Sequence, residues 1–167
     1  SSTKKNIEYK NKKFEVISFS EFLKLNGNNY DLFFNYAFLT GNKVKEYKSD
    51  RFNNETNMII EGTQKFLENN SVAKILLTSS GAIYNNGTNK ESIYGLQKLK
   101  QEKKLLDTCK SLSTKVSVAR IFALIANYYN HEYEYAFSSF INQAKKNKKI
   151  VIKPNHQVIR SYLFLDS

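Results

Sequence analysis

The chain has little cysteine and no long apolar run, and each of these absences excludes a class of protein. Cys109 is the only cysteine, so no intramolecular disulfide can form, which favours a reducing, cytoplasmic location. No apolar run approaches the roughly 18 residues that a membrane span needs, and no secretory leader opens the chain. We therefore expect a cytoplasmic protein without a membrane partner.

Arginine is also scarce, although the formal net charge is +11. A basic chain has two interpretations: an anionic partner such as nucleic acid, or lysines spread over the surface. The lysines are scattered along the chain, and only Arg51, Arg120 and Arg160 offer the guanidinium that reads phosphates and bases. This pattern favours surface lysines over nucleic-acid binding. With only His131 and His156 present, no metal site is expected.

Hydrophobic periodicity predicts strands that alternate with helices along one domain-sized chain. Strands that are separated by helices along the chain are typical of right-handed βαβ units. We therefore expect an α/β fold with a parallel sheet covered on both faces by helices. The predicted strands are 14–17, 30–37, 73–78, 115–122, 150–153 and 159–165, and the predicted helices are 20–25, 54–69, 91–112 and 134–146. Loops are expected at 40–53, 84–90 and 126–133.

The stretch 78–98 carries the residues with the clearest chemistry. A buried strand ends at Ser79 and Ser80, and the next helix places Tyr94 and Lys98 one turn apart on one face. Ligands of doubly wound sheets bind at the carboxyl ends of strands. A nearby cation favours the phenolate form of a tyrosine, which then exchanges a proton with a substrate hydroxyl, while a serine bonds the same oxygen. The alternative is a surface tyrosine above a solvated lysine.

In this context the sequence resembles the extended short-chain dehydrogenase/reductases, the NAD-dependent epimerase/dehydratase family, which act on nucleotide sugars. The segments that carry the resemblance are 31–37, 57–63, 76–84, 94–98, 118–122, 136–141 and 159–166. The resemblance implies a Rossmann-like fold and a catalytic trio of Ser80, Tyr94 and Lys98. It also implies hydride transfer to NAD or NADP, with a nucleotide-diphosphate sugar as the partner.

The resemblance assigns further binding residues by position. Cofactor-binding residues are expected at Ala37, Asn57, Thr78, Ser79, Tyr94 and Lys98. Ser80 and Arg160 are expected to bind the substrate, with Arg160 on its diphosphate. Residues 1–125 correspond to a partial NAD-binding domain, and residues 126–167 to the start of a substrate-binding region.

Departures from the family pattern qualify these expectations. None of the six glycines has the spacing of the family's Gly-x-x-Gly-x-x-Gly turn, so the chain resembles a product truncated at both ends, with weakened cofactor binding. A missing central strand leaves unpaired edges, which favours self-association. Gly81 and Ala82 stand where dehydratases carry an Asp-Glu pair, which favours 4-epimerisation or keto-sugar reduction. The alternatives are a catalytically inactive Rossmann-like fragment and a basic polyanion-binding module.

Overall fold

The protein is described by a computed structural model that covers residues 5–85, 92–125, 136–146, 149–152 and 161–165. The chain divides into two compact units, Ser1–Arg120 and Ile121–Ser167, and each is described by itself. The sequence places the domain boundary after residue 125, and that assignment stays a prediction. None of the helices described has both the length and the apolar character needed to cross a membrane.

A three-stranded sheet in the order β4-β6-β7 forms the centre of the first unit. Its strands are β4 (Phe33–Asn35), β6 (Lys74–Ser80) and β7 (Lys115–Ile121). β4 and β6 run parallel with Asn35 opposite Leu77, and a parallel pair of short strands, β3 (Asn29–Tyr30) and β5 (Ser71–Val72), precedes them. Parallel strands joined by a helix confirm the predicted Rossmann-like α/β class.

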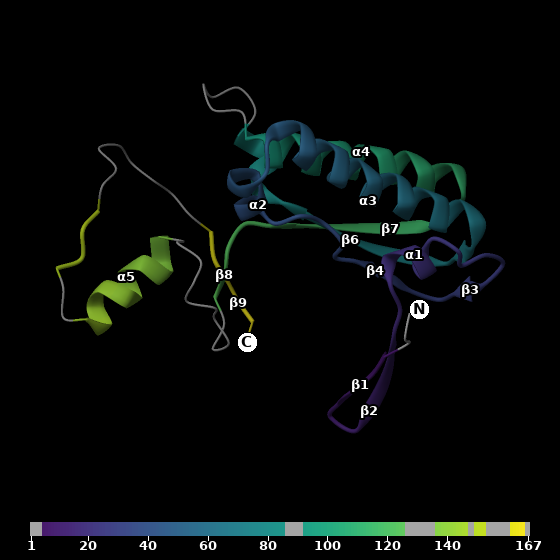
Figure 1. Cartoon of the computed structure of the whole chain (residues 1–167), viewed down its shortest axis with the longest axis horizontal. Coiled ribbons are helices and arrows are strands. Elements are labelled where there is room, and N and C mark those ends of the chain that lie inside the picture. The colour runs from purple at the N-terminus through teal and green to yellow at the C-terminus, as the bar shows by residue number, and fades with distance from the viewer. Residues whose placement is uncertain (1–4, 86–91, 126–135, 147–148, 153–160, 166–167) are drawn as a thin grey trace. The chain divides into compact units, whose positions relative to one another are not determined.

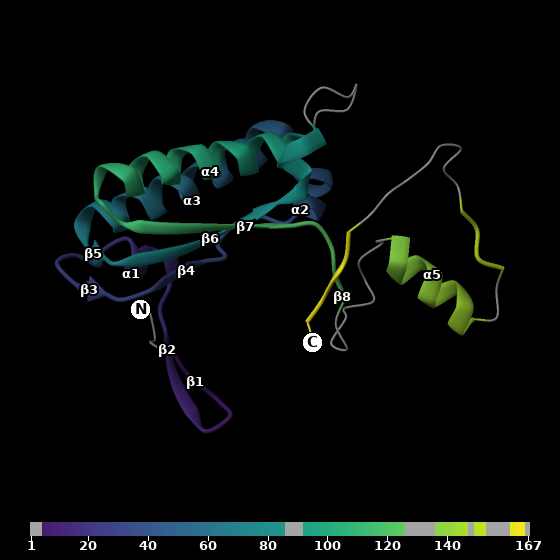
Figure 2. The same cartoon turned by 180° about the vertical axis from the view of Figure 1, so that it is seen from behind.

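Two long helices, α3 (Ser49–Asn69) and α4 (Ile93–Ser111), lie side by side along one face of this sheet (Figures 1 and 2). Apolar side chains from the helices and the strands meet in a core cluster. Its buried members are Phe66, Leu67, Val72, Ile75, Leu77, Leu105 and Cys109. Burial among these side chains raises the pKa of the Cys109 thiol, which fits a core residue and not a nucleophile.

A short helix, α1 (Phe19–Phe22), packs on α3 through a glycine. Ser18 and Glu21 form a capping box that starts α1, with the Glu21 amide donating to Ser18 Oγ at 3.2 Å. A Cβ added to Gly62 of α3 would lie 2.7 Å from side-chain atoms of both Phe19 and Leu23. The missing side chain at Gly62 therefore allows α1 to approach α3 closely.

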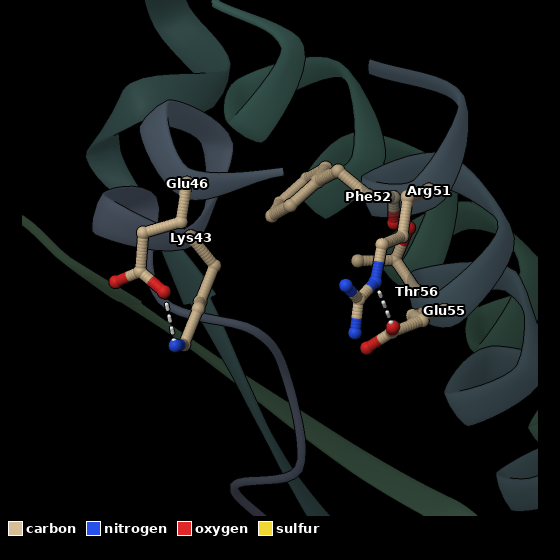
Figure 3. Close-up of polar contacts among 6 residues, drawn as sticks. All are labelled: Lys43, Glu46, Arg51, Phe52, Glu55 and Thr56. Atoms are coloured by element: carbon tan, nitrogen blue, oxygen red, sulfur yellow. Dashed lines mark hydrogen bonds and ion pairs between the residues drawn. The ribbon is translucent and has the colours of Figure 1, made fainter. Parts of the chain in front are cut away.

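The predicted loop 40–53 is wrong, because this segment contains α2 (Gly41–Glu46) and the first turn of α3. Figure 3 shows the two ion pairs of this region, Lys43 with Glu46 and Arg51 Nε with Glu55 at 2.8 Å. The Arg51 guanidinium also lies 4.0 Å from the ring centre of Tyr47. Such local, exposed contacts leave no apolar period in the sequence, which explains why the periodicity missed these turns.

The N-terminal hairpin also departs from the predicted pattern. One strand was expected at 14–17, whereas β1 (Lys5–Tyr9) and β2 (Lys12–Val16) pair antiparallel. The turn residues Lys10 and Asn11 have φ angles of 48° and 61°, as in a two-residue turn of type I′. Lys-Asn is a weak signal for this turn, which is most often formed by Asn-Gly.

Two further strand predictions need correction. The single strand expected at 30–37 bends at Asp31, which separates β3 from β4. Residues 150–152, expected to begin a strand, are not in a strand. An apolar run in the sequence therefore does not by itself establish continuous strand geometry.

The described part of the second unit contains two short strands and a helix. β8 (Leu124–Ile125) pairs parallel with β9 (Leu163–Phe164), and α5 (Ala136–Lys145) falls within the predicted helix 134–146. The rings of Phe137 and Tyr162 lie 5.7 Å apart, which connects α5 to the residue before β9. The expected loop 126–133 lies outside the described residues.

Two leucines of α4 test this assignment of the core. Leu105 is 0% exposed, whereas Leu96 on the same helix is 40% exposed. We expect Leu105→Ala to lower the free energy of unfolding by about 2–5 kcal/mol, because it leaves a cavity in the core, and Leu96→Ala to lower it by less than about 1 kcal/mol. Urea denaturation followed by circular dichroism measures both, and equal losses would contradict the assignment.

Candidate active site

Ser79 and Ser80 end the central strand β6, and the 3-10 helix η1 (Gly81–Asn85) follows directly. The amide of Ala82 donates a hydrogen bond to Ser80 Oγ at 3.2 Å. Because this bond uses the oxygen as an acceptor, the hydroxyl proton of Ser80 stays available to a second oxygen. Ser80 is half-buried, whereas the side chain of Ser79 is buried.

Tyr94 lies in the first turn of α4, which is brought against η1 by a glycine. Ser92 caps the helix, with its Oγ accepting from the Gly95 amide at 3.3 Å. A Cβ on Gly95 would lie 2.6 Å from the carbonyl oxygen of Ala82, so only glycine permits this approach. The contact brings the turn that carries Tyr94 against the turn that follows Ser80.

Lys98, one helical turn after Tyr94, is a buried cation with 4% of its surface exposed. Its Nζ donates to the Thr78 carbonyl oxygen and to Gln101 Oε1, both at 3.1 Å. The ring centre of Phe38 lies 4.0 Å from the same nitrogen. Burial lowers the pKa of Lys98 to about 8, because removal from water disfavours the charged form.

Phe38 contacts both residues of the Tyr-x-x-x-Lys pair. Its ring meets that of Tyr94 edge-on, with centres 5.8 Å apart and planes at 82°, while it also covers the Lys98 ammonium. Phe38 follows β4, so the carboxyl ends of β4 and β6 and the first turns of α4 meet at one corner. This is the edge at which doubly wound sheets bind ligands.

A buried polar network joins the ends of β4 and β6. Thr78 Oγ1 donates to the Asn35 carbonyl oxygen at 2.9 Å, and Asn35 Oδ1 accepts from the Ala37 amide at 3.1 Å. Gln101 Nε2 donates to the Ala37 carbonyl oxygen at 3.1 Å. Two of the expected cofactor residues, Ala37 and Thr78, are thereby connected to Lys98.

Sequence reasoning missed Asn35 and Gln101. Asn35 interrupts the apolar run 32–39, whereas Gln101 stands in the polar stretch 100–104. Each is almost fully buried, Asn35 within a short central strand and Gln101 three residues after Lys98 on the helix. Buried polar side chains are normally retained for their hydrogen bonds. A polar residue inside an apolar run was therefore the available signal for Asn35, and the sequence offers no such signal for Gln101.

A second network connects β7, α4 and η1. Glu102 is buried, and its carboxylate accepts from Arg120 Nε at 3.2 Å and also from Arg120 Nη2. Arg120 Nη1 donates to the Tyr84 hydroxyl at 2.5 Å. Pairing with Arg120 lowers the pKa of Glu102, and the same bond raises the pKa of Arg120. These contacts secure the turn after Ser80.

The remaining expected residues lie apart from this corner or outside the described chain. Asn57 is half-buried on α3, where its Oδ1 accepts from Lys100 Nζ at 2.8 Å. Arg160 and both histidines lie outside the described residues. The structure therefore groups Ala37, Thr78, Ser79, Ser80, Tyr94 and Lys98 near one end of β6, and Asn57 on a helix surface.

A parallel sheet with a serine at its carboxyl edge, beside a helix that opens with Tyr-x-x-x-Lys, defines a Rossmann-like α/β protein. The model of the NAD dependent epimerase/dehydratase family matches residues 18–166, and the chain belongs to this family. This confirms the resemblance predicted from the motifs. No curated protein sequence matches the chain.

Solved structures share the fold at low sequence identity. The UDP-N-acetylglucosamine 4-epimerase of Methanobrevibacter ruminantium is 19% identical, with a TM-score of 0.60 over 80% of this chain and 47% of that one. The UDP-glucuronic acid 4-epimerase of Bacillus cereus, solved with UDP-glucuronic acid and NAD, is 18% identical, with a TM-score of 0.64 over 81% and 46%.

A third similar structure is the UDP-glucose 4-epimerase of Thermotoga maritima, which is 17% identical, with a TM-score of 0.62 over 81% of this chain and 48% of that one. At these identities the likeness establishes the fold. The chain spans about half the length of the solved relatives that it matches.

Glycine substitutions test the contact between α4 and η1. We expect Gly95→Ala to destabilise the protein by about 1–3 kcal/mol, because the new methyl group meets a backbone carbonyl that cannot rotate away. Gly41→Ala is the matched control, since a Cβ there meets no atom within 4 Å. Thermal unfolding compares the two, and an unchanged midpoint for Gly95→Ala would refute the close approach.

Burial of Lys98 has a consequence for stability as a function of pH. Its pKa is about 8 when folded and near the ordinary 10.5 when unfolded, so the unfolded chain binds more protons between these values. The stability attributable to this group is present above about pH 10.5 and is lost as the pH falls from there through 8. Methionine does not titrate. Between pH 7 and pH 10.5 the free energy of unfolding of the wild type should therefore rise by about 3 kcal/mol relative to that of Lys98→Met. Denaturant titrations at the two pH values measure this difference, and a constant difference would show an exposed lysine.

Proposed function

We propose that the chain carries the proton-transfer site of an NAD(P)-dependent nucleotide-sugar 4-epimerase or keto-sugar reductase. The observation that supports this most is the shared corner at the end of β6. There Ser80, Tyr94 and the buried Lys98 lie on elements in direct contact, with Phe38 touching both Tyr94 and Lys98. A solvated lysine below a surface tyrosine, the alternative interpretation, does not fit a cation with 4% exposure.

The three side chains have separate roles in this proposal. The positive charge of Lys98 favours the phenolate of Tyr94, which removes the proton from a sugar hydroxyl as the hydroxyl becomes a carbonyl. Ser80, whose oxygen already accepts from Ala82, donates its own proton to the same sugar oxygen. In the reverse direction Tyr94 returns the proton to the carbonyl oxygen.

The cofactor proposal rests on the carboxyl ends of β4 and β6. Asn35 Nδ2 is buried there and has no hydrogen-bond partner among the described residues, so it offers a donor to a ligand. Ala37 is exposed, and Thr78 and Ser79 continue the same edge. A bound nicotinamide supplies the hydride acceptor that no side chain offers. The NAD in the Bacillus cereus structure supports this assignment.

The substrate proposal is a nucleotide-diphosphate sugar, as named for the similar epimerases, with Arg160 on the diphosphate. Gly81 and Ala82 follow Ser80, and neither side chain can act as an acid or a base. Elimination of water needs such groups, so this sequence favours 4-epimerisation or reduction over dehydration.

Self-association is a further part of the proposal. Within the described residues β4 pairs only with β6, so its other edge offers free backbone groups. Phe34 of this strand and Tyr36 just after it are 51% and 65% exposed. An unpaired edge with exposed aromatic side chains favours association with another chain.

Binding to a polyanion is the competing function, and the described arginines argue against it. Arg51 pairs with Glu55 and Arg120 pairs with Glu102, so both guanidinium groups are engaged by carboxylates. A gel-shift titration with nucleic acid at several salt concentrations separates the two functions. Tight, salt-dependent binding would favour a polyanion partner.

Tyr94→Phe tests the proposed chemistry directly. We expect it to lower the rate of nicotinamide reduction by a UDP-sugar by about 10²–10⁴-fold, because the phenol is the proton acceptor. Tyr47→Phe is the control, since Tyr47 lies at the end of α2 beside Arg51. Stopped-flow absorbance follows the reduction. An unchanged rate in Tyr94→Phe would refute the assigned role. If calorimetry of the wild-type chain detects binding of neither NAD nor a nucleotide sugar, the catalytic proposal is refuted.

A further inference from the structure

Gln101, a hydrogen-bond partner of Lys98, is almost fully buried, with 1% of its surface exposed. Its two polar atoms serve two different elements. Oε1 accepts from Lys98 Nζ at 3.1 Å, and Nε2 donates to the carbonyl oxygen of Ala37 at 3.1 Å. One side chain therefore joins the buried ammonium to the segment that leaves β4.

The chemistry of these two neighbours restricts the residue that can stand between them. An ammonium group only donates hydrogen bonds, and a backbone carbonyl only accepts them. A side chain that satisfies both needs an acceptor and a donor, and the amide of glutamine provides them without adding a charge. A carboxylate would meet the Ala37 carbonyl with a second acceptor, and an apolar side chain would leave both groups without this partner.

The position of the Lys98 ammonium also has to be fixed, because a lysine side chain has four flexible bonds. The Thr78 carbonyl holds the ammonium from β6, and Gln101 holds it from α4 itself. Through Ala37, Gln101 also anchors the residue preceding Phe38, whose ring covers the ammonium and touches Tyr94. Gln101 thus bonds both the ammonium itself and the residue next to the ring that covers it.

We propose that Gln101 is a positioning residue that fixes the Lys98 ammonium at the ends of β4 and β6, beside Tyr94, and holds Phe38 over it. The consequence of this positioning for catalysis rests on the proposed function. The arrangement itself is a property of the chain, and it can be measured without cofactor or substrate. Gln101 touches no reacting atom, so it acts through Lys98.

The test is an NMR titration of Lys98 in the chain labelled with ¹³C at lysine Cε, with the signal assigned by its loss in Lys98→Arg. In wild type we expect the midpoint near the pKa of about 8. Gln101→Met keeps the length of the side chain but removes the acceptor, so the midpoint should fall by about one pH unit. Gln101→Glu places a negative charge beside the ammonium, so the midpoint should rise by about one pH unit or more.

Gln97→Met is the matched control. Gln97 lies on the same helix and donates to Asn53 Oδ1 at 2.9 Å, without a hydrogen bond to Lys98. Opposite shifts in the two Gln101 variants, with a wild-type midpoint in Gln97→Met, would support the proposal. Unchanged midpoints in the Gln101 variants, shifts in one common direction, or an equal shift in the control would overturn it.

The proposal can be tested even if one variant does not fold. If Gln101→Met fails to fold, Gln101→Glu decides alone, with a raised midpoint in support and an unchanged or lowered one against. Failure of the proposed reaction gives a different result, namely absent nicotinamide reduction in a wild-type chain whose Lys98 titrates as described. The two failures are therefore distinguishable.

Discussion

The buried ammonium of Lys98 is the constraint from which the rest of the site follows. A charge removed from water costs several kcal/mol unless protein groups replace the water, so its surroundings must be polar on selected sides. The chain meets this requirement with the Thr78 carbonyl, the Gln101 amide and the ring of Phe38. These groups come from β6, α4 and the segment after β4, and solvating one cation therefore joins three elements at one corner.

The two halves of helix α4 make different kinds of contact: polar in the N-terminal half and apolar in the C-terminal half. Its N-terminal half carries Lys98, directed to the ends of β4 and β6, and Glu102, paired with Arg120 of β7. Its C-terminal half carries Leu105 and Cys109, which pack in the apolar core. Polar contacts thus fix the carboxyl edge of the sheet, where direction and register matter, while non-directional hydrophobic packing stabilises the opposite end. This division matches the location of ligand sites in doubly wound folds.

Much of this arrangement could be predicted from the sequence, and the exceptions share a physical cause. The strand ending at Ser80 and the helix carrying Tyr94 and Lys98 have strong periodic signals, and the motifs identified the family correctly. The helix α2 was missed because its exposed ion pair leaves no apolar period. Gln101 was missed because its importance depends on contacts with Ala37, 64 positions away in the chain. Long-range polar pairing has no local signature.

The charged, immobilised state of Lys98 is the central claim, and the ¹⁵N spectrum of the lysine ammonium groups tests it most directly. Exposed amines exchange protons with water too rapidly to give signals at neutral pH, whereas a buried, hydrogen-bonded ammonium exchanges slowly. We expect a protected ammonium signal below pH 8 that disappears in Lys98→Arg. A spectrum in which Lys98 gives no such signal, in a folded protein, would contradict the buried cation and with it the arrangement of the site.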